Sequence, residues 1–288
     1  MTGPVAALIG GNRLHLQHGP IDLIIGVDGT DAARANAFAA AEARFQTILH
    51  GLASDLPRHR ERLGTETPLP DDPVARRMYT AARPFAARHF LTPMIAVAGA
   101  VADEVLAAMV SAAPMMRAYV NNGGDIAVYL TKGHSFSVAM ATPKGRDIGR
   151  ICFDSDHRIG GIASSGAGGR SHSLGIAENV TVLAETAAQA DTVATLIANA
   201  VDLPDHPGIR RTPASDLNPD SDLGDRLVTT HVPPLGRNDI WRALEPGEAL
   251  ANRMLETGQI KAAALFLQNR SVQIGGAFDL PKPEPLHA

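Results

Sequence analysis

The residues best suited to chemistry are a carboxylate and a hydroxyl, Asp191 and Thr195, four positions apart in an apolar stretch. Thr186 and Gln189 form a T-x-x-Q capping box, which predicts a helix that starts at Ala187. Asp191 then lies beyond the first turn of the helix. The helix dipole alone would account for a carboxylate within that turn, but it does not account for Asp191. Residues four apart share a helix face, and Mg²⁺ binds such oxygen ligands together with water and phosphate. The pair therefore predicts either a cation site or an ordinary solvated face.

A second candidate lies in the segment YVNNGGDIAVYL, residues 119–130, where apolar residues flank a polar turn. Asn-Gly between two strands is typical of a hairpin, because both residues adopt positive φ at little cost. Here Asn122 is followed by Gly123, Gly124 and the carboxylate of Asp125. Paired glycines also let a ligand approach the main chain closely. We therefore predict a hairpin, with a ligand site at its tip as a further hypothesis.

A third candidate is the glycine- and serine-rich segment GGIASSGAGGRSH, residues 160–172. Its N–H groups and hydroxyls suit a phosphate or an oxyanion. It lacks the Gly-Lys-Ser/Thr of a P-loop and the G-x-S-x-G of a serine-hydrolase elbow. Histidine is a common general base near neutral pH, and His172 closes the segment. The alternatives are a flexible surface loop in which His172 has no role, and an unrelated hydrolase that uses Ser165 with His172.

The candidate residues must be positioned by helices and strands, which alternate along the chain. Apolar periodicity predicts helices over 31–56, 74–83, 94–110, 187–201 and 241–256, and strands over 5–27, 115–120, 125–130, 135–140, 149–153, 180–184, 261–268 and 272–274. Residues 160–169 and 203–224 are expected to be loops. The clustered strands after residue 115 predict an antiparallel meander packed by helices, so the fold class is α+β. We expect one domain over 1–280 and a disordered tail over 281–288.

Composition narrows the class of protein. The net charge of −4 argues against general nucleic-acid binding. Cys152 is the only cysteine, so an internal disulfide is excluded. No run of 18 consecutive apolar residues and no convincing signal peptide is present, which favours a cytoplasmic protein without a membrane partner. Small-residue helices and the edge of the meander are compatible with a homodimer.

The order of these motifs resembles the ApbE-like family, whose founding activity is FAD:protein FMN transfer. Residues 122–126, NGGDI, are similar to the family's N-x-G-G-D-I stretch, and Ser164-Ser165-Gly166 to its Thr-Ser-Gly. Residues 179–195 are similar to its V-T-V strand and A-D-x-x-x-T helix, and Gly99 to Asp103 more faintly to its K-G-x-x-x-D segment. The resemblance covers about residues 90–202 and implies an ApbE-like (T-fold-like) domain.

The resemblance also implies a ligand set and a reaction. Asp191 and Thr195 would bind Mg²⁺ together with the carbonyl of Val97. Asn122, Gly123, Gly124 and Asp125 would line the flavin site with Ser164, Ser165 and Gly166. His172 would activate the hydroxyl of a Ser or Thr in an acceptor protein. That hydroxyl would attack the FMN phosphorus of FAD and AMP would leave.

The chain departs from the family pattern at two places. Ala98 stands where the family has lysine, and the D-P-x-T-G stretch after the histidine is missing. These losses leave three expectations open: an FMN transferase, an FAD pyrophosphatase, and a flavin- or nucleotide-binding protein of the same fold without catalysis.

Overall fold

The computed structural model describes residues 3–142, 145–168 and 172–280. The chain packs into two compact units, each made of several separate segments of the sequence. The first contains residues 1–134, 158–163 and 184–192, and the second contains 135–157, 164–183 and 193–288. The expectation of one domain over 1–280 stays a prediction, and the tail over 281–288 lies outside the described residues.

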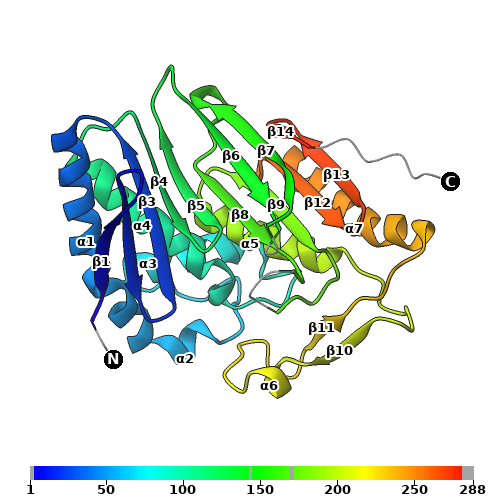
Figure 1. The fold of residues 1–288 in the computed structure, drawn as a ribbon. Coiled ribbons are helices and arrows are strands. Elements are labelled where there is room, and N and C mark those ends of the chain that lie inside the picture. Colours follow the sequence, from blue (N-terminus) through cyan, green and yellow to red (C-terminus); the bar gives the residue numbers. More distant parts are fainter. Residues whose placement is uncertain (1–2, 143–144, 169–171, 281–288) are drawn as a thin grey trace. The chain divides into compact units, whose positions relative to one another are not determined.

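The first unit is an antiparallel sheet packed by helices (Figure 1). Its strands are β1 (Val5–Ile9), β2 (Arg13–His18), β3 (Ile21–Asp28), β4 (Arg117–Asn122), β5 (Asp125–Leu130) and the start of β8 (Gly161–Ser165), in that order across the sheet. Its helical segments are α1 (Asp31–Ser54), α2 (Leu56–His59), α3 (Pro73–Ala82), η1 (Arg83–Phe85), η2 (Pro93–Ala96), α4 (Val97–Ala112) and the first half of α5 (Ala187–Ala200).

The small-residue helix α4 is the centre of this unit. It packs against the helices α1 and α3 and against the strands β4 and β5. Gly99, Ala100 and Ala102 are buried, which lets neighbouring backbones come close. By length and composition Pro93–Ala112 could cross a membrane, but the buried core helix of a soluble protein has the same character. The expectation of no membrane partner therefore stays a prediction.

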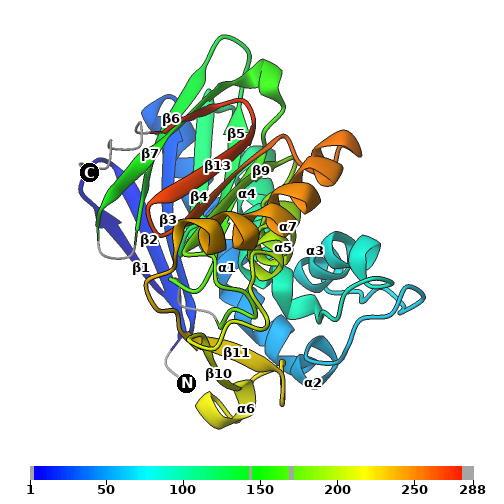
Figure 2. The same ribbon diagram turned by 90° about the vertical axis from the view of Figure 1, so that its right-hand side faces the viewer.

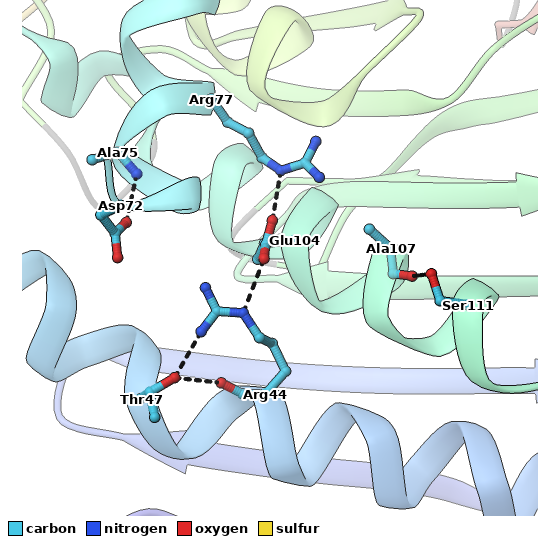
Figure 3. Close-up of polar contacts among 8 residues, drawn as sticks. All are labelled: Arg44, Thr47, Asp72, Ala75, Arg77, Glu104, Ala107 and Ser111. Atoms are coloured by element: carbon cyan, nitrogen blue, oxygen red, sulfur yellow. Dashed lines mark hydrogen bonds and ion pairs between the residues drawn. The ribbon is translucent and has the colours of Figure 1, made fainter. Parts of the chain in front are cut away.

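One carboxylate links three of these helices (Figure 3). Glu104 of α4 accepts hydrogen bonds from the Nε atoms of Arg44 on α1 and Arg77 on α3, each at 2.9 Å. Burial raises the pKa of Glu104, but the two arginines outweigh burial and hold that pKa below its usual value. Asp72 caps α3 by accepting the N–H of Ala75 at 2.9 Å.

The second unit holds three groups of strands and one long helix. Its strands are β6 (Ser135–Ala141), β7 (Asp147–Asp154), β9 (Asn179–Ala184, except its last residue), β10 (Arg210–Pro213), β11 (Leu227–His231), β12 (Ala262–Leu267), β13 (Arg270–Gly275) and β14 (Phe278–Asp279). Strands β9, β12 and β13 pair in that order, β14, β7 and β6 form a second sheet, and β10 pairs with β11. Helix α7 (Arg237–Glu256) packs on β12 and β13 (Figure 2). The short segments η3 (Ser155–His157) and α6 (Ala214–Leu217) complete the unit.

The α+β class is confirmed, but three local expectations are wrong. Strand β6 pairs with β7 and not with β5, whose other neighbour is β8, so the meander ends at residue 130. Residues 161–165 form a strand inside the segment expected to be a loop. The Pro- and Asp-rich segment 203–224 contains β10 and α6. The strands β8 and β10 depend on pairing with other strands, β5 and β11, which local composition does not report.

Candidate functional site

The NNGGD segment forms the expected hairpin between β4 and β5. Asn122 and Asp125 face each other across the turn, and Gly123 and Gly124 have φ values of 66° and 116°. Positive φ at both central residues is what a type I′ turn requires. The Oδ1 atom of Asn121 accepts the N–H of Gly124 at 2.8 Å. A Cβ on Gly124 would meet no atom within 4 Å, so the main chain at the tip lies open.

The hairpin reaches the start of α4. Asn122 donates from Nδ2 to the carbonyl oxygen of Ala98 at 3.1 Å. At the same place the carboxylate of Asp191 accepts the N–H of Gly99 at 3.0 Å. Asn122 and Asp191, which are 69 positions apart in the chain, thus meet at one helix N-terminus.

Helices α4 and α5 cap each other through two aspartates. Asp191 of α5 caps α4, and Asp103 of α4 accepts the N–H groups of Ala187 at 3.0 Å and Ala188 at 2.9 Å. The third N–H of α5, that of Gln189, is bound by Thr186 Oγ1 at 3.2 Å, as the capping box predicts. The sequence interpretation gave Asp103 no such role, because its contacts lie 84 and 85 positions along the chain.

Burial dominates the protonation of both aspartates. It raises the pKa of Asp103 to about 6, although the N–H groups of Ala188 and Ala187 favour the charged form. Burial also raises the pKa of Asp191 well above its usual value, and the nearby carboxylate of Asp125 raises it further. The N–H groups of Gly99 and Ala98 act in the opposite direction.

The surroundings of Asp191 therefore disfavour the ionised form of its carboxyl group. Among the described residues, the side chains that act on its pKa are the carboxylates of Asp125 and Asp103. A divalent cation beside Asp191 and Asp125 would stabilise both ionised forms. The described residues hold no cluster of three or more His, Cys, Asp or Glu side chains suited to a metal. This donor set fits Mg²⁺, which typically uses one or two carboxylates, better than zinc.

The other half of the A-D-x-x-x-T pattern makes a separate contact in the second unit. Thr195, one turn after Asp191 on α5, donates from Oγ1 to the Oγ of Ser165 at 3.2 Å. Ser164 is hydrogen-bonded to Thr181 at 2.8 Å. One hydroxyl contact, between Ser165 and Thr195, therefore joins the predicted Ser-Ser-Gly segment to the threonine of the A-D-x-x-x-T pattern.

Close packing accounts for the glycines on either side of this motif. A Cβ on Gly160 or Gly161 would overlap the backbone of residues 185–187 within the first unit. In the second unit a Cβ on Gly166 or Gly168 would lie 2.8 Å from a backbone carbonyl oxygen. Gly166 also has a φ of 141°. The glycines are thus needed for packing, whatever ligand the segment binds.

The remaining predicted residues, Val97 and His172, make none of the contacts described above. Val97 is the first residue of α4, so its carbonyl is near the capped N-terminus. His172 is exposed and lies outside the helices and strands, next to residues 169–171, which are outside the described residues.

The second unit contains a cavity of about 230 Å³, and the residues that follow the Ser-Ser-Gly motif in the sequence are part of its lining. Its lining residues are Ala167, Gly168, Ile176, Glu178, Thr229, Thr230, His231, Val232, Leu267 and Gln268. The Oγ1 atom of Thr229 is buried and has no hydrogen-bond partner among the described residues. Ligand pockets typically measure about 300–1,000 Å³, so this cavity is too small for a whole dinucleotide.

Comparison with known proteins identifies a family whose model matches this chain. A family model described as AbpE bacteria matches residues 5–277. A UPF0280 protein of Methanopyrus kandleri is 41% identical over 127 residues, which cover 44% of this chain and 48% of that protein. A UPF0280 protein of Methanothrix thermoacetophila is 34% identical over 129 residues, 45% of this chain and 52% of that protein. The match thus spans about half the length of these curated relatives.

Two solved structures are also similar. The flavin transferase ApbE of Vibrio cholerae is 12% identical with a TM-score of 0.47, covering 95% of this chain and 98% of that chain. The flavinyl transferase ApbE of Pseudomonas stutzeri, in its apo form, is 14% identical with a TM-score of 0.45, covering 95% and 94%.

Proposed function

Because the chain belongs to the family described as AbpE bacteria, a divergent branch of the ApbE-like superfamily, we propose that it is a Mg²⁺-dependent enzyme acting on FAD. The proposed reaction transfers FMN to a Ser or Thr hydroxyl of an acceptor protein in the cytoplasm. The observation that carries the proposal is the convergence of Asn122, Asp191 and the α4 N-terminus, with Asp125 close enough to raise the pKa of Asp191.

The donor set supports Mg²⁺ at this position. Asp191 and Asp125 would hold the ion, with the Thr195 hydroxyl one turn further on α5 and the Val97 carbonyl as additional oxygen ligands. When bound, Mg²⁺ would neutralise charge on the pyrophosphate of FAD. The open main chain at Gly124 supports close approach of the flavin nucleotide to the hairpin tip.

The chain's own groups would carry the proton transfer and the positioning. The acceptor hydroxyl oxygen forms a bond to the FMN phosphorus, and the bond from that phosphorus to the bridging oxygen breaks. AMP leaves with the bonding electron pair. His172 would take the hydroxyl proton as general base. Asn122 to Asp125 and Ser164 to Gly166 would orient the nucleotide, which is the main source of catalysis in phosphoryl transfer.

A second function, flavin or nucleotide binding without turnover, is favoured by two observations. Ala98 removes the positive side chain expected beside the phosphates. Asp191 already has a structural task, because it caps α4. A helix cap alone is worth about 1 kcal/mol, so this aspartate would be useful even without a metal.

The test is a titration of FAD into the protein, following flavin fluorescence and AMP release with and without Mg²⁺. Asp191→Asn keeps the shape of the side chain, and Asp205→Asn, at an exposed loop position, is the matched control. We expect Mg²⁺-dependent AMP release that Asp191→Asn abolishes and Asp205→Asn preserves. FAD binding without AMP would favour the binding protein, and no binding would reject both functions.

A further inference from the structure

Strand β1, residues Val5–Ile9, is an exposed apolar edge. It is the terminal strand of the first unit's sheet and pairs with β2 (Figure 1, dark blue). All five residues, VAALI, are apolar, and four of the five are exposed. Val5 is 56% exposed and Leu8 is 76% exposed. This combination is unusual in a soluble protein, because an open strand edge offers unpaired N–H and C=O groups to other chains.

The register with β2 shows which side chains extend the core. Ala6 pairs with Leu16 and Leu8 pairs with Leu14, and both β2 leucines are 1% exposed. Directly paired residues point to the same face of a sheet. The apolar face that is covered on β2 therefore continues onto β1, where Leu8 is left uncovered.

The strand carries none of the usual protections against pairing. Edge strands are commonly blunted by a charge, a proline or a bulge. Residues 5–9 contain no charged residue and no proline, and their pairing with β2 is regular over five residue pairs. Nothing in residues 5–9 thus prevents the edge from pairing with another strand.

We propose that β1 pairs antiparallel with β1 of a second copy of this chain, about a two-fold axis at Ala7. Such pairing is self-complementary: Ala7 faces Ala7, Ala6 faces Leu8, and Val5 faces Ile9. Because the strand is uncharged, the two copies meet without like-charge repulsion. The uncovered leucines of both copies then lie on one continuous sheet face.

The size of this contact sets its strength. Stable complexes bury roughly 1,200–2,000 Å² in total, more than two five-residue edges alone provide. We therefore expect a reversible dimer with a dissociation constant in the micromolar range. The proposal is independent of FAD or Mg²⁺ binding.

Analytical ultracentrifugation of the full chain over a wide concentration range tests the surface. We expect dimer to form with rising concentration in the wild type, and Leu8→Lys to stay monomeric. Leu227→Lys is the matched control, because Leu227 is also apolar and 55% exposed but lies on β11. Circular dichroism checks that both variants fold. A monomer at all wild-type concentrations, or a dimer that survives Leu8→Lys, would overturn the proposal.

Disulfide trapping tests the register. Directly opposed Cα atoms in an antiparallel pair lie about 4.5–5.5 Å apart, within the span of a disulfide. In a Cys152→Ser background, Ala7→Cys should form a covalent dimer under mild oxidation. Ala6→Cys should not, since two copies of residue 6 lie diagonally, about 7–8 Å apart. Equal trapping at both positions would reject the two-fold axis at Ala7.

Discussion

At the scale of single residues, the aspartates are the most informative feature. Asp191 caps a helix in surroundings that disfavour its ionised form, so one side chain serves both stability and the proposed metal site. Asp103 has the simpler task of capping α5 through two N–H groups. The exchange of caps fixes both helix N-termini against each other and so positions Asp191.

The raised pKa of Asp103 gives a pH-dependent prediction. Its folded pKa of about 6 exceeds the ordinary value of 3.8, so the folded state binds more protons between these values. The unfolding free energy contributed by this group is therefore highest below pH 4 and is lost as pH rises towards 6. Relative to Asp103→Asn, the wild type should gain up to about 3 kcal/mol on acidification from neutral pH to pH 4.

Urea denaturation of the two proteins at several pH values measures this difference. Titrating groups that do not interact with Asp103 are shared by both proteins, so their effects cancel in the comparison. Asp191, whose pKa the Asp103 carboxylate raises, also contributes to the difference. A constant difference between pH 4 and pH 7 would show that the Asp103 carboxyl is not desolvated in solution.

At the scale of elements, the contact between α4 and α5 depends on Gly99. A Cβ there would overlap the carbonyl group of Ala187, and backbone atoms cannot move aside without shifting a helix. We expect Gly99→Ala to lower the unfolding free energy by about 1–3 kcal/mol, despite the better helix propensity of alanine. Gly276→Ala, where a Cβ meets nothing within 4 Å, should change it little. Thermal denaturation compares them, and equal stability of the two variants would contradict the close contact.

The three-helix ion pair gives a second prediction at this scale. Glu104→Gln leaves Arg44 and Arg77 without their carboxylate partner (Figure 3). The side chain of Glu104 is 13% exposed, while those of Arg44 and Arg77 are 21% and 36% exposed. Screening by solvent therefore reduces the free energy that is lost when the ion pair is broken. We expect destabilisation by about 1–2 kcal/mol, between surface and buried pairs. Glu66→Gln, at an exposed position, is the control. A change no larger than that of the control would mean that the pair does not stabilise the packing.

At the scale of the whole molecule, ligand binding must appear as added stability. A ligand that binds only the folded chain stabilises it by about 2.7 kcal/mol at a hundred times its dissociation constant. Under the proposed function, FAD with Mg²⁺ should raise the melting temperature by several degrees. Asp191→Asn should remove most of this shift and Asp205→Asn should keep it. A shift that is unchanged in Asp191→Asn would place the ligand elsewhere.

The local sequence was sufficient for most helices and strands and for the hairpin tip. Periodicity located α1, α3, α4 and α5 to within a few residues, because an amphipathic or apolar stripe depends only on residues close together in the sequence. The capping box and the Asn-Gly turn are equally local, and the contacts of Thr186 and the positive φ of both turn glycines confirm them.

Other features depended on residues far apart in the chain. The strand character of residues 161–165 and the packing role of Gly99 and Gly160 arise from such contacts. The caps supplied by Asp103 and Asp191 span 84 to 92 positions. No short-range pattern encodes them, because a buried carboxylate is explained only by the N–H groups that the folded chain brings to it.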